Sequence, residues 1–199
     1  MLGSGTHPPK RKLKTVETQH VKDEDIDWTT LDMNPDVNPD VVFDLNRIET
    51  YDERDGCKDS RCRTCFPLPF EPDTFDEIHA YDVMEHYGRQ GDYAGFFRGF
   101  RELWRILKPG GYVIGVVPLW NSKGAWADPG HTRVITDVVL SYLDKTWYDD
   151  NLFLPDGSQN TNSPLTDYRS FVAPYWWRLA DSTEETTLGG YYFALQKVV

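Results

Sequence analysis

The chain has 199 residues and a formal net charge of −11, with 21 Lys and Arg against 32 Asp and Glu. This length suits one domain with a sizeable core rather than two. The acidic balance disfavours a nucleic-acid-binding protein, because that affinity comes from clustered cationic side chains. Apolar runs are too short to span a membrane and no secretory signal is visible, so we expect a cytoplasmic protein with no membrane partner.

The first half of the chain offers two short strands. Residues 1–27 are polar with little periodicity, and predict a poorly packed helix or a loop. Trp28–Asp32 and Val41–Leu45 are short apolar runs that each contain an acid at or near the end, and the turn residues of 34–40 separate them. Residues 46–67 are charged and without period, which predicts a long loop with one helical turn at most.

Three cysteines lie within that loop, at Cys57, Cys62 and Cys65. An odd number in this spacing does not indicate a secreted disulfide framework. The spacing permits zinc, although a closed zinc site needs a fourth ligand, which would be His79, His20 or a carboxylate. The alternative is a loop with reduced thiols.

The middle of the chain has the clearest pattern. Phe75–Tyr81 predicts a strand, Asp82–Tyr87 the start of a helix, and Tyr93–Leu107 a helix with one apolar stripe. The sequence Lys108–Gly111 ends that helix. Tyr112–Val117 is almost continuously apolar, as expected of a central parallel strand covered on both faces.

The last third predicts one helix, an irregular insertion and two strands. Ile135–Trp147 has helical periodicity, and 149–167 is rich in turn residues. Phe171–Thr187 and Gly190–Val199 predict an antiparallel hairpin. The whole of 1–199 is therefore expected to form one α/β domain, Rossmann-like, with a mostly parallel sheet and the hairpin at its C-terminal edge.

In such a fold the ligand binds at the carboxyl ends of the strands. The sequence predicts four segments there: Gly3–Gly5, Asp32, Asp44–Leu45 and Tyr81–Asp82. Glycines allow close approach of the backbone to a ligand. An acid at the second strand end can accept hydrogen bonds from ribose hydroxyls, and groups at the third can meet an adenine.

A series of motifs then carries a family resemblance. These motifs are Glu85–His86, Gly88–Asp92, Phe96–Phe97, Trp104–Gly111 and Asp128–Arg133. The chain resembles class I methyltransferases that depend on S-adenosylmethionine (SAM), over nearly its whole length, and in particular a set of which many are encoded by phages. The resemblance implies a methyl-transfer enzyme with SAM as its cofactor.

The resemblance also implies SAM contacts, residue by residue. It places the methionine end of SAM on Gly3, Ser4 and Gly5, the ribose on Asp32 beside Met33, the adenine on Asp44 and Leu45, and the sulfonium beside Tyr81. The first motif departs from the family, because Thr6–Pro9 follows the glycine pair in place of a third glycine. Either the chain starts inside a longer protein, or its sheet lacks part of the central strand.

His86 and His131 are the candidate catalytic residues, as a base or as acceptor contacts, because both follow predicted strand ends. The structural alternatives are a cap for His86 and a loop anchor for His131. We expect Arg133 to pair with Asp128, or else to bind an acidic acceptor.

The acceptor is expected to be a small molecule or a protein. The chain has neither the Asp/Asn-Pro-Pro-aromatic motif of amino-group DNA methylation nor a Pro-Cys nucleophile for cytosine. Five tryptophans are candidates to line its pocket: Trp120, Trp126, Trp147, Trp176 and Trp177. Three other functions stay open: a domain that binds SAM without transferring methyl, a zinc-stabilised interaction module at 57–65, and a nucleotide enzyme of the same fold that does not use SAM. The sequence makes no prediction of oligomeric state.

Overall fold

The structure is a computed structural model that describes residues 27–48, 68–163, 165–187 and 189–199. Its centre is a four-stranded sheet in the order β3-β4-β6-β5, formed by Phe75–Tyr81, Leu107–Pro118, Gly190–Lys197 and Trp177–Glu185 respectively. Strands β3 and β4 are parallel, whereas β6 runs antiparallel to both β4 and β5. The predicted α/β fold, with parallel strands followed by a C-terminal antiparallel hairpin, is confirmed.

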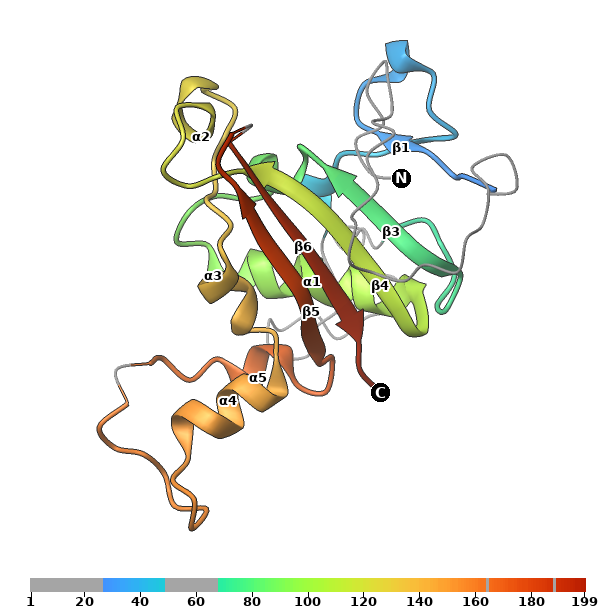
Figure 1. The fold of residues 1–199 in the computed structure, drawn as a ribbon. Helices are drawn as coiled ribbons and strands as arrows, with labels where there is room; N and C mark the ends of the chain where they lie inside the picture. The colour runs from blue at the N-terminus through green and yellow to red at the C-terminus, as the bar shows by residue number, and fades with distance from the viewer. Residues whose placement is uncertain (1–26, 49–67, 164, 188) are drawn as a thin grey trace.

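Helix α1 (Tyr93–Ile106) connects β3 to β4 and covers one face of the sheet (Figure 1). Asp92 begins it, because its carboxylate accepts a hydrogen bond from the Gly95 N–H at 2.9 Å. Its apolar stripe packs into the main core, to which all four strands of the central sheet contribute side chains. The stripe consists of Phe96, Phe97, Phe100, Leu103 and Ile106. The predicted helix and its packing role are therefore confirmed.

The segment after α1 turns directly into β4. Gly110 has φ +78°, and a Cβ on Gly111 would lie 2.7 Å from the main-chain oxygen of Asp76. Only glycine therefore allows β3 and β4 to approach this closely at that end. Lys108, in the same irregular stretch of β4, forms an ion pair with the Asp76 carboxylate at 2.8 Å. The strand therefore begins at Leu107 rather than at the predicted Tyr112.

Two short parallel strands, β1 (Leu31–Asp32) and β2 (Val41–Val42), form a second pair. Between them lies the 3-10 turn η2 (Pro35–Val37). The predicted strand over 41–45 is too long, because Asp44 accepts a hydrogen bond from the Asn46 N–H at 2.9 Å and begins η3 (Leu45–Arg47). This turn is the one predicted for the loop at 46–67, of which 49–67 lie outside the described residues.

Three predictions in the second half are wrong. The helix over 135–147 is two helices, α3 (Asp137–Ser141) and α4 (Lys145–Leu152), because the Asp144 carboxylate caps a new start through the Thr146 N–H at 2.8 Å. The irregular insertion thus begins after α4 rather than at 149. The strand predicted from Phe171 starts only at Trp177, after the short helix α5 (Arg169–Val172).

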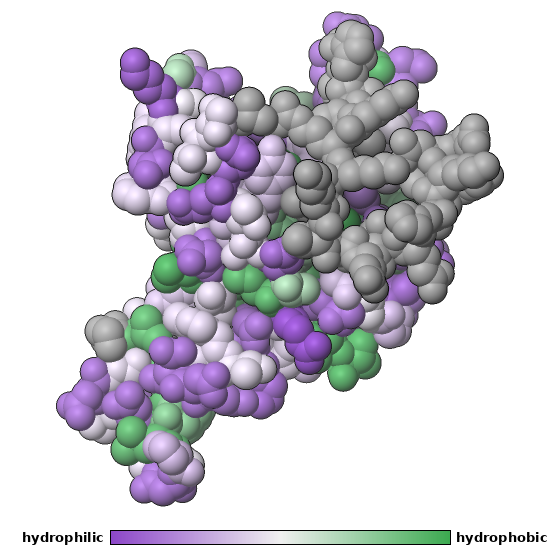
Figure 2. Space-filling model, viewed as in Figure 1, coloured by the Kyte–Doolittle hydropathy of each residue, from purple (hydrophilic) through white to green (hydrophobic). Residues whose placement is uncertain are grey.

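The visible described surface is mostly hydrophilic or near neutral, with apolar residues in scattered patches (Figure 2). No helix in the described part of the chain has the length and apolar character that a membrane crossing requires.

Candidate active site

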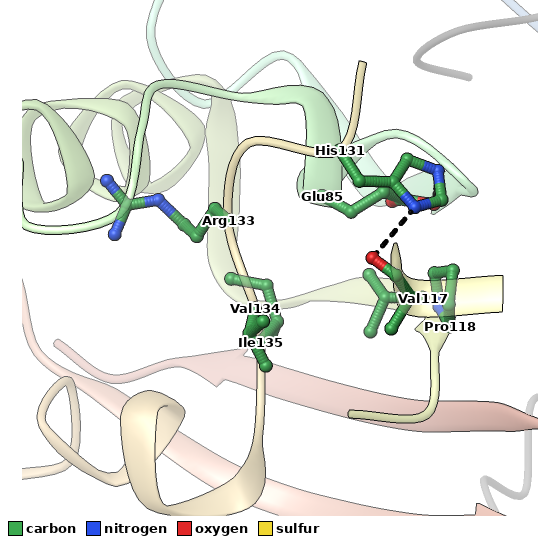
Figure 3. Close-up of a pocket in the computed structure, with 8 residues that line it drawn as sticks. Glu85, Val117, Pro118, His131, Arg133, Val134 and Ile135 are labelled. Carbon is green, nitrogen blue, oxygen red and sulfur yellow. Dashed lines mark hydrogen bonds and ion pairs between the residues drawn. The ribbon is translucent and has the colours of Figure 1, made fainter. Parts of the chain in front are cut away.

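Three side chains meet beyond the carboxyl ends of β3 and β4. Glu85 and His86 belong to η5 (Met84–His86), a single 3-10 turn where the sequence predicted the start of a helix, and His131 lies in the loop after α2 (Gly124–Ala127). One ligand atom from each lies within 4.8 Å of the other two. The two imidazole centroids are 4.7 Å apart. Figure 3 shows Glu85 and His131 together near the end of β4.

The Glu85 carboxylate is buried and lacks a hydrogen-bond partner. The residue is 3 % exposed, and neither carboxylate oxygen has a partner within the described structure. Burial raises its pKa to about 7; its own main-chain N–H opposes the shift, and the charges of Asp82 and Asp128 add to it. Because an unsatisfied buried carboxylate is costly, this group is a candidate for binding or catalysis.

Both imidazoles are oriented by main-chain carbonyls. His86 Nδ1 lies 3.0 Å from the Gly130 oxygen, and His131 Nδ1 lies 3.4 Å from the Ala125 oxygen. A carbonyl only accepts, so Nδ1 carries the proton and Nε2 of each neutral ring is an acceptor. His131 Nε2 lies 4.0 Å from Glu85 Oε1 and 4.0 Å from Asp128 Oδ2. The cluster therefore presents two basic nitrogens beside a buried carboxyl group.

Arg133 holds the loop of His131 against the turn of Glu85. Its Nη2 donates to the carbonyl oxygens of Arg89 at 2.7 Å and Asp92 at 2.8 Å. The expectation that Arg133 pairs with Asp128 is wrong, because the guanidinium is bonded to these two carbonyls instead. It points away from Glu85 and His131 (Figure 3). Burial lowers the pKa of this guanidinium.

Main-chain hydrogen bonds complete this attachment. The N–H groups of Thr132 and Arg133 both donate to the Glu85 carbonyl, at 2.9 and 3.1 Å. Two segments more than forty residues apart in sequence are thus fixed as one unit around the three side chains.

Comparison with known proteins identifies the family. The methyltransferase-domain family model matches residues 16–115, half of the chain. The chain belongs to this methyltransferase-domain family. No curated protein sequence matches it.

Solved structures similar to this methyltransferase include the [4+2]-cyclase SpnF, at 12% identity and a TM-score of 0.50, over 100% of this chain and 73% of that one. That likeness concerns the fold alone. A SAM-dependent methyltransferase from Aquifex aeolicus is 12% identical over 85% of this chain and 68% of its own, with a TM-score of 0.41. One from Archaeoglobus fulgidus is 12% identical over 84% and 75%, with a TM-score of 0.42.

The predicted ribose and adenine acids of the methyltransferase hold turns at adjacent strand ends. Asp32 Oδ1 accepts from the Asn34 N–H at 2.8 Å, and Asp44 caps η3 as described above. Leu45 is half-buried, and Met33 is 66 % exposed. Because β1 and β2 are parallel, these residues lie at the same edge of the pair. Their SAM contacts stay predictions.

Asn46 links this edge to the histidine cluster and was missed in the sequence. Its side-chain oxygen accepts from the Gly88 N–H at 2.7 Å, and its nitrogen donates to the His86 carbonyl at 3.4 Å. The residues predicted to contact adenine are therefore joined through one amide to the turn that carries His86. An Asn two residues after Asp44 gives only a weak sequence signal.

Tyr81 ends β3, and a chain of two hydrogen bonds joins its hydroxyl to His79 and then to Glu77 of the same strand. Its hydroxyl lies 2.7 Å from His79 Nδ1, and His79 Nε2 lies 2.9 Å from Glu77 Oε2. The Trp28 ring meets His79 edge-on with centroids 4.9 Å apart. Burial, assisted by the Glu77 charge, raises the pKa of Tyr81 to about 12, so the phenol stays protonated.

Sequence reasoning named both histidines but gave Glu85 no role. The available signals were its position next to His86 after a strand end and its place in the Glu85–His86 motif. The predicted contacts Gly3, Ser4 and Gly5 and the candidate zinc ligands Cys57, Cys62 and Cys65 lie outside the described residues.

Proposed function

We propose that this methyltransferase moves the SAM methyl group to a small molecule or a protein side chain that enters beside Glu85, His86 and His131. The observation that carries the proposal is the buried Glu85 carboxyl group beside two imidazoles whose Nδ1 atoms are bonded to carbonyls, which leaves Nε2 of each ring as the acceptor. Action in the cytoplasm and a phage origin are parts of the same proposal, and they rest on the sequence alone.

The reaction needs little covalent help from the protein. A lone pair of the acceptor attacks the methyl carbon as the carbon–sulfur bond breaks, and the sulfonium becomes a neutral thioether. The enzyme contributes in-line positioning and exclusion of water. A proton leaving the acceptor is taken by an imidazole Nε2, and the nearby Glu85, when ionised, stabilises the imidazolium that forms.

The surroundings favour a neutral or cationic acceptor with an apolar or aromatic part. Asp82 and Asp128 add negative charge near the cluster, which disfavours nucleic acid. Trp120, which follows β4, is 49 % exposed, and Trp126 in α2 is 70 % exposed beside Ala125, which lines the pocket. The Trp126 ring N–H donates to the Trp120 carbonyl at 3.0 Å, which orients its indole. Of the other three candidate tryptophans, Trp177 is in the core, and Trp147 and Trp176 are partly buried against that core.

The cofactor assignment is tested by calorimetric titration with SAM. Asp32→Ala is expected to weaken SAM binding at least about tenfold, because the ribose loses its carboxylate, while the melting temperature stays near that of the wild type. Asp36→Ala, at an exposed position of η2, is the matched control and keeps full affinity. Undiminished SAM binding by Asp32→Ala contradicts the ribose assignment.

The transfer itself is tested with methyl-labelled SAM against pools of small molecules and proteins. We expect His86→Gln and His131→Gln to lower the rate of labelling about a hundredfold without changing SAM affinity. A wild-type protein that binds SAM but labels nothing in either pool contradicts the proposed acceptor classes.

A further inference from the structure

We infer that Glu85, His86 and His131 bind one divalent transition-metal cation, for which Zn²⁺ is the best chemical match. This site deepens the proposed function, because it gives the acceptor side of the active site its chemistry. Metal binding is measurable without SAM or acceptor, so the two proposals succeed or fail separately.

The ligand types fit that class of cation. Two imidazoles and one carboxylate bind first-row divalent metals, whereas Mg²⁺ and Ca²⁺ prefer sites made of oxygen atoms. Three protein ligands also leave a coordination position open for a water molecule or an acceptor atom. This set is independent of the three cysteines.

The geometry requires only side-chain adjustment. Tetrahedral ligands about 2.1 Å from zinc lie roughly 3.4 Å apart, and the three present groups offer atoms within 4.8 Å of one another. Both rings already have the orientation that metal-binding histidines adopt, with Nδ1 bonded to a carbonyl and Nε2 left for the metal. For His131, Nε2 is the atom that faces Glu85.

Glu85 supplies the second, independent observation. Four charged side chains of the described ranges are buried: Glu85, Glu102, Arg133 and Lys197. Glu102 accepts from Arg105 and from the Leu68 N–H at 2.9 to 3.0 Å, and Lys197 bonds the Leu107 carbonyl and Asp73. Arg133 donates to the carbonyl oxygens of Arg89 and Asp92. Glu85 differs from these three because both of its oxygens lack a hydrogen-bond partner.

Among the described residues no Lys or Arg forms an ion pair with this carboxylate, and its one ion-pair contact is with His131 Nε2 at 4.0 Å, which is charged only when protonated. Arg133 lines the same pocket but directs its guanidinium elsewhere (Figure 3). Asp82 and Asp128 lie close enough to disfavour its ionisation further. A divalent cation at this point would satisfy the carboxylate and offset the negative charge around it. Bound there, it would occupy the Nε2 lone pairs, so the imidazoles could no longer take the acceptor's proton. The cation would replace them as a Lewis acid that orients the acceptor and lowers its pKa.

The test measures Zn²⁺ binding by competition with a chromophoric chelator. Cys57, Cys62 and Cys65 are all changed to Ser in the full chain, so that thiolates cannot contribute. We expect one equivalent of Zn²⁺ to bind this variant, and Glu85→Gln or His131→Gln in the same background to weaken binding at least about a hundredfold. Glu77→Gln and His79→Gln are the matched controls, and they keep the affinity within about threefold.

Thermal unfolding in EDTA checks that every variant is folded. Co²⁺ absorption of the wild-type chain gives a second measurement, because visible bands lost in Glu85→Gln report this site without removing any cysteine. The inference is overturned if the cysteine-free chain binds no Zn²⁺, or if the Glu77 and His79 variants lose as much affinity as the Glu85 and His131 variants. Intact SAM binding alongside either result leaves the proposed function standing.

Discussion

The chain has two carboxylate–imidazole clusters, one within β3 and one around the turn just after it. They differ in how many of their polar atoms have hydrogen-bond partners. In the first, Glu77, His79 and Tyr81 form a relay in which both nitrogens of His79 have partners, at 2.7 and 2.9 Å. In the second, His86 and His131 make their hydrogen bonds to described residues through Nδ1. The Glu85 carboxylate has no hydrogen-bond partner among those residues, only the contact with His131 Nε2 at 4.0 Å.

The difference follows from how each cluster is built. Alternate residues of a strand lie on one face of the sheet, so residues 77, 79 and 81 meet by local geometry alone and saturate one another. The second cluster joins two segments more than forty residues apart, and Glu85 and His131 line a pocket there. Within the described part of the chain, the Glu85 oxygens lack hydrogen-bond partners. The first cluster, whose polar atoms bond one another, supports the fold. The second, whose carboxylate lacks a hydrogen-bond partner among the described residues, is suited to bind a ligand.

The largest expected effect comes from removing the side chain that joins the two segments of the second cluster. Arg133→Ala leaves the carbonyls of Arg89 and Asp92 without their buried donor, and should lower the free energy of unfolding by about 3 kcal/mol. Urea unfolding measures it. Arg169→Ala, which breaks an exposed pair with Asp167, should cost less than about 1 kcal/mol. Equal losses would show that the second cluster does not depend on Arg133.

The next effect is a change in the pH dependence of stability, measured without metal. The ordinary pKa of Glu85 is 4.5 and burial raises it to about 7, so the folded protein holds more protons between these values. Stability therefore falls as pH rises through this window, and the loss is complete above pH 7. Glu85→Gln should raise the free energy of unfolding at pH 8 by roughly 2 kcal/mol, and change it little at pH 4.

Glu77→Gln is the control in the first cluster. Its carboxylate is one-third exposed and bonded to His79, so the substitution should lower stability at pH 8 by less than about 1 kcal/mol. If Glu85→Gln also lowers stability at pH 8, the carboxylate is satisfied in solution and the contrast between the clusters is lost.

The sequence predicted the parts of the fold that have strong periodicity. β3 matches its predicted bounds, and α1 ends one residue before its predicted end, because alternation and an apolar stripe are local signals. The break between α3 and α4 was missed because Asp144 fits a helix interior as well as a cap, and its main-chain contacts decide between them.

The candidate site was predicted as separate residues rather than as a constellation. His86 and His131 each follow a strand end, but their approach to 4.7 Å depends on hydrogen bonds between distant segments. The burial of Glu85 is likewise a tertiary property, since a glutamate in a polar turn is ordinarily exposed. Only the structure could show that its carboxylate lacks a partner.

The smallest expected effect tests the first cluster at Tyr81. Tyr81→Phe removes the hydroxyl that bonds His79 and should lower the free energy of unfolding by about 1 kcal/mol, while SAM affinity stays within about threefold because the ring remains. Tyr93→Phe, exposed on α1, is the control for loss of a hydroxyl. An unchanged stability with much weaker SAM binding would reverse the assignment, because the first cluster would then act on the cofactor rather than on the fold.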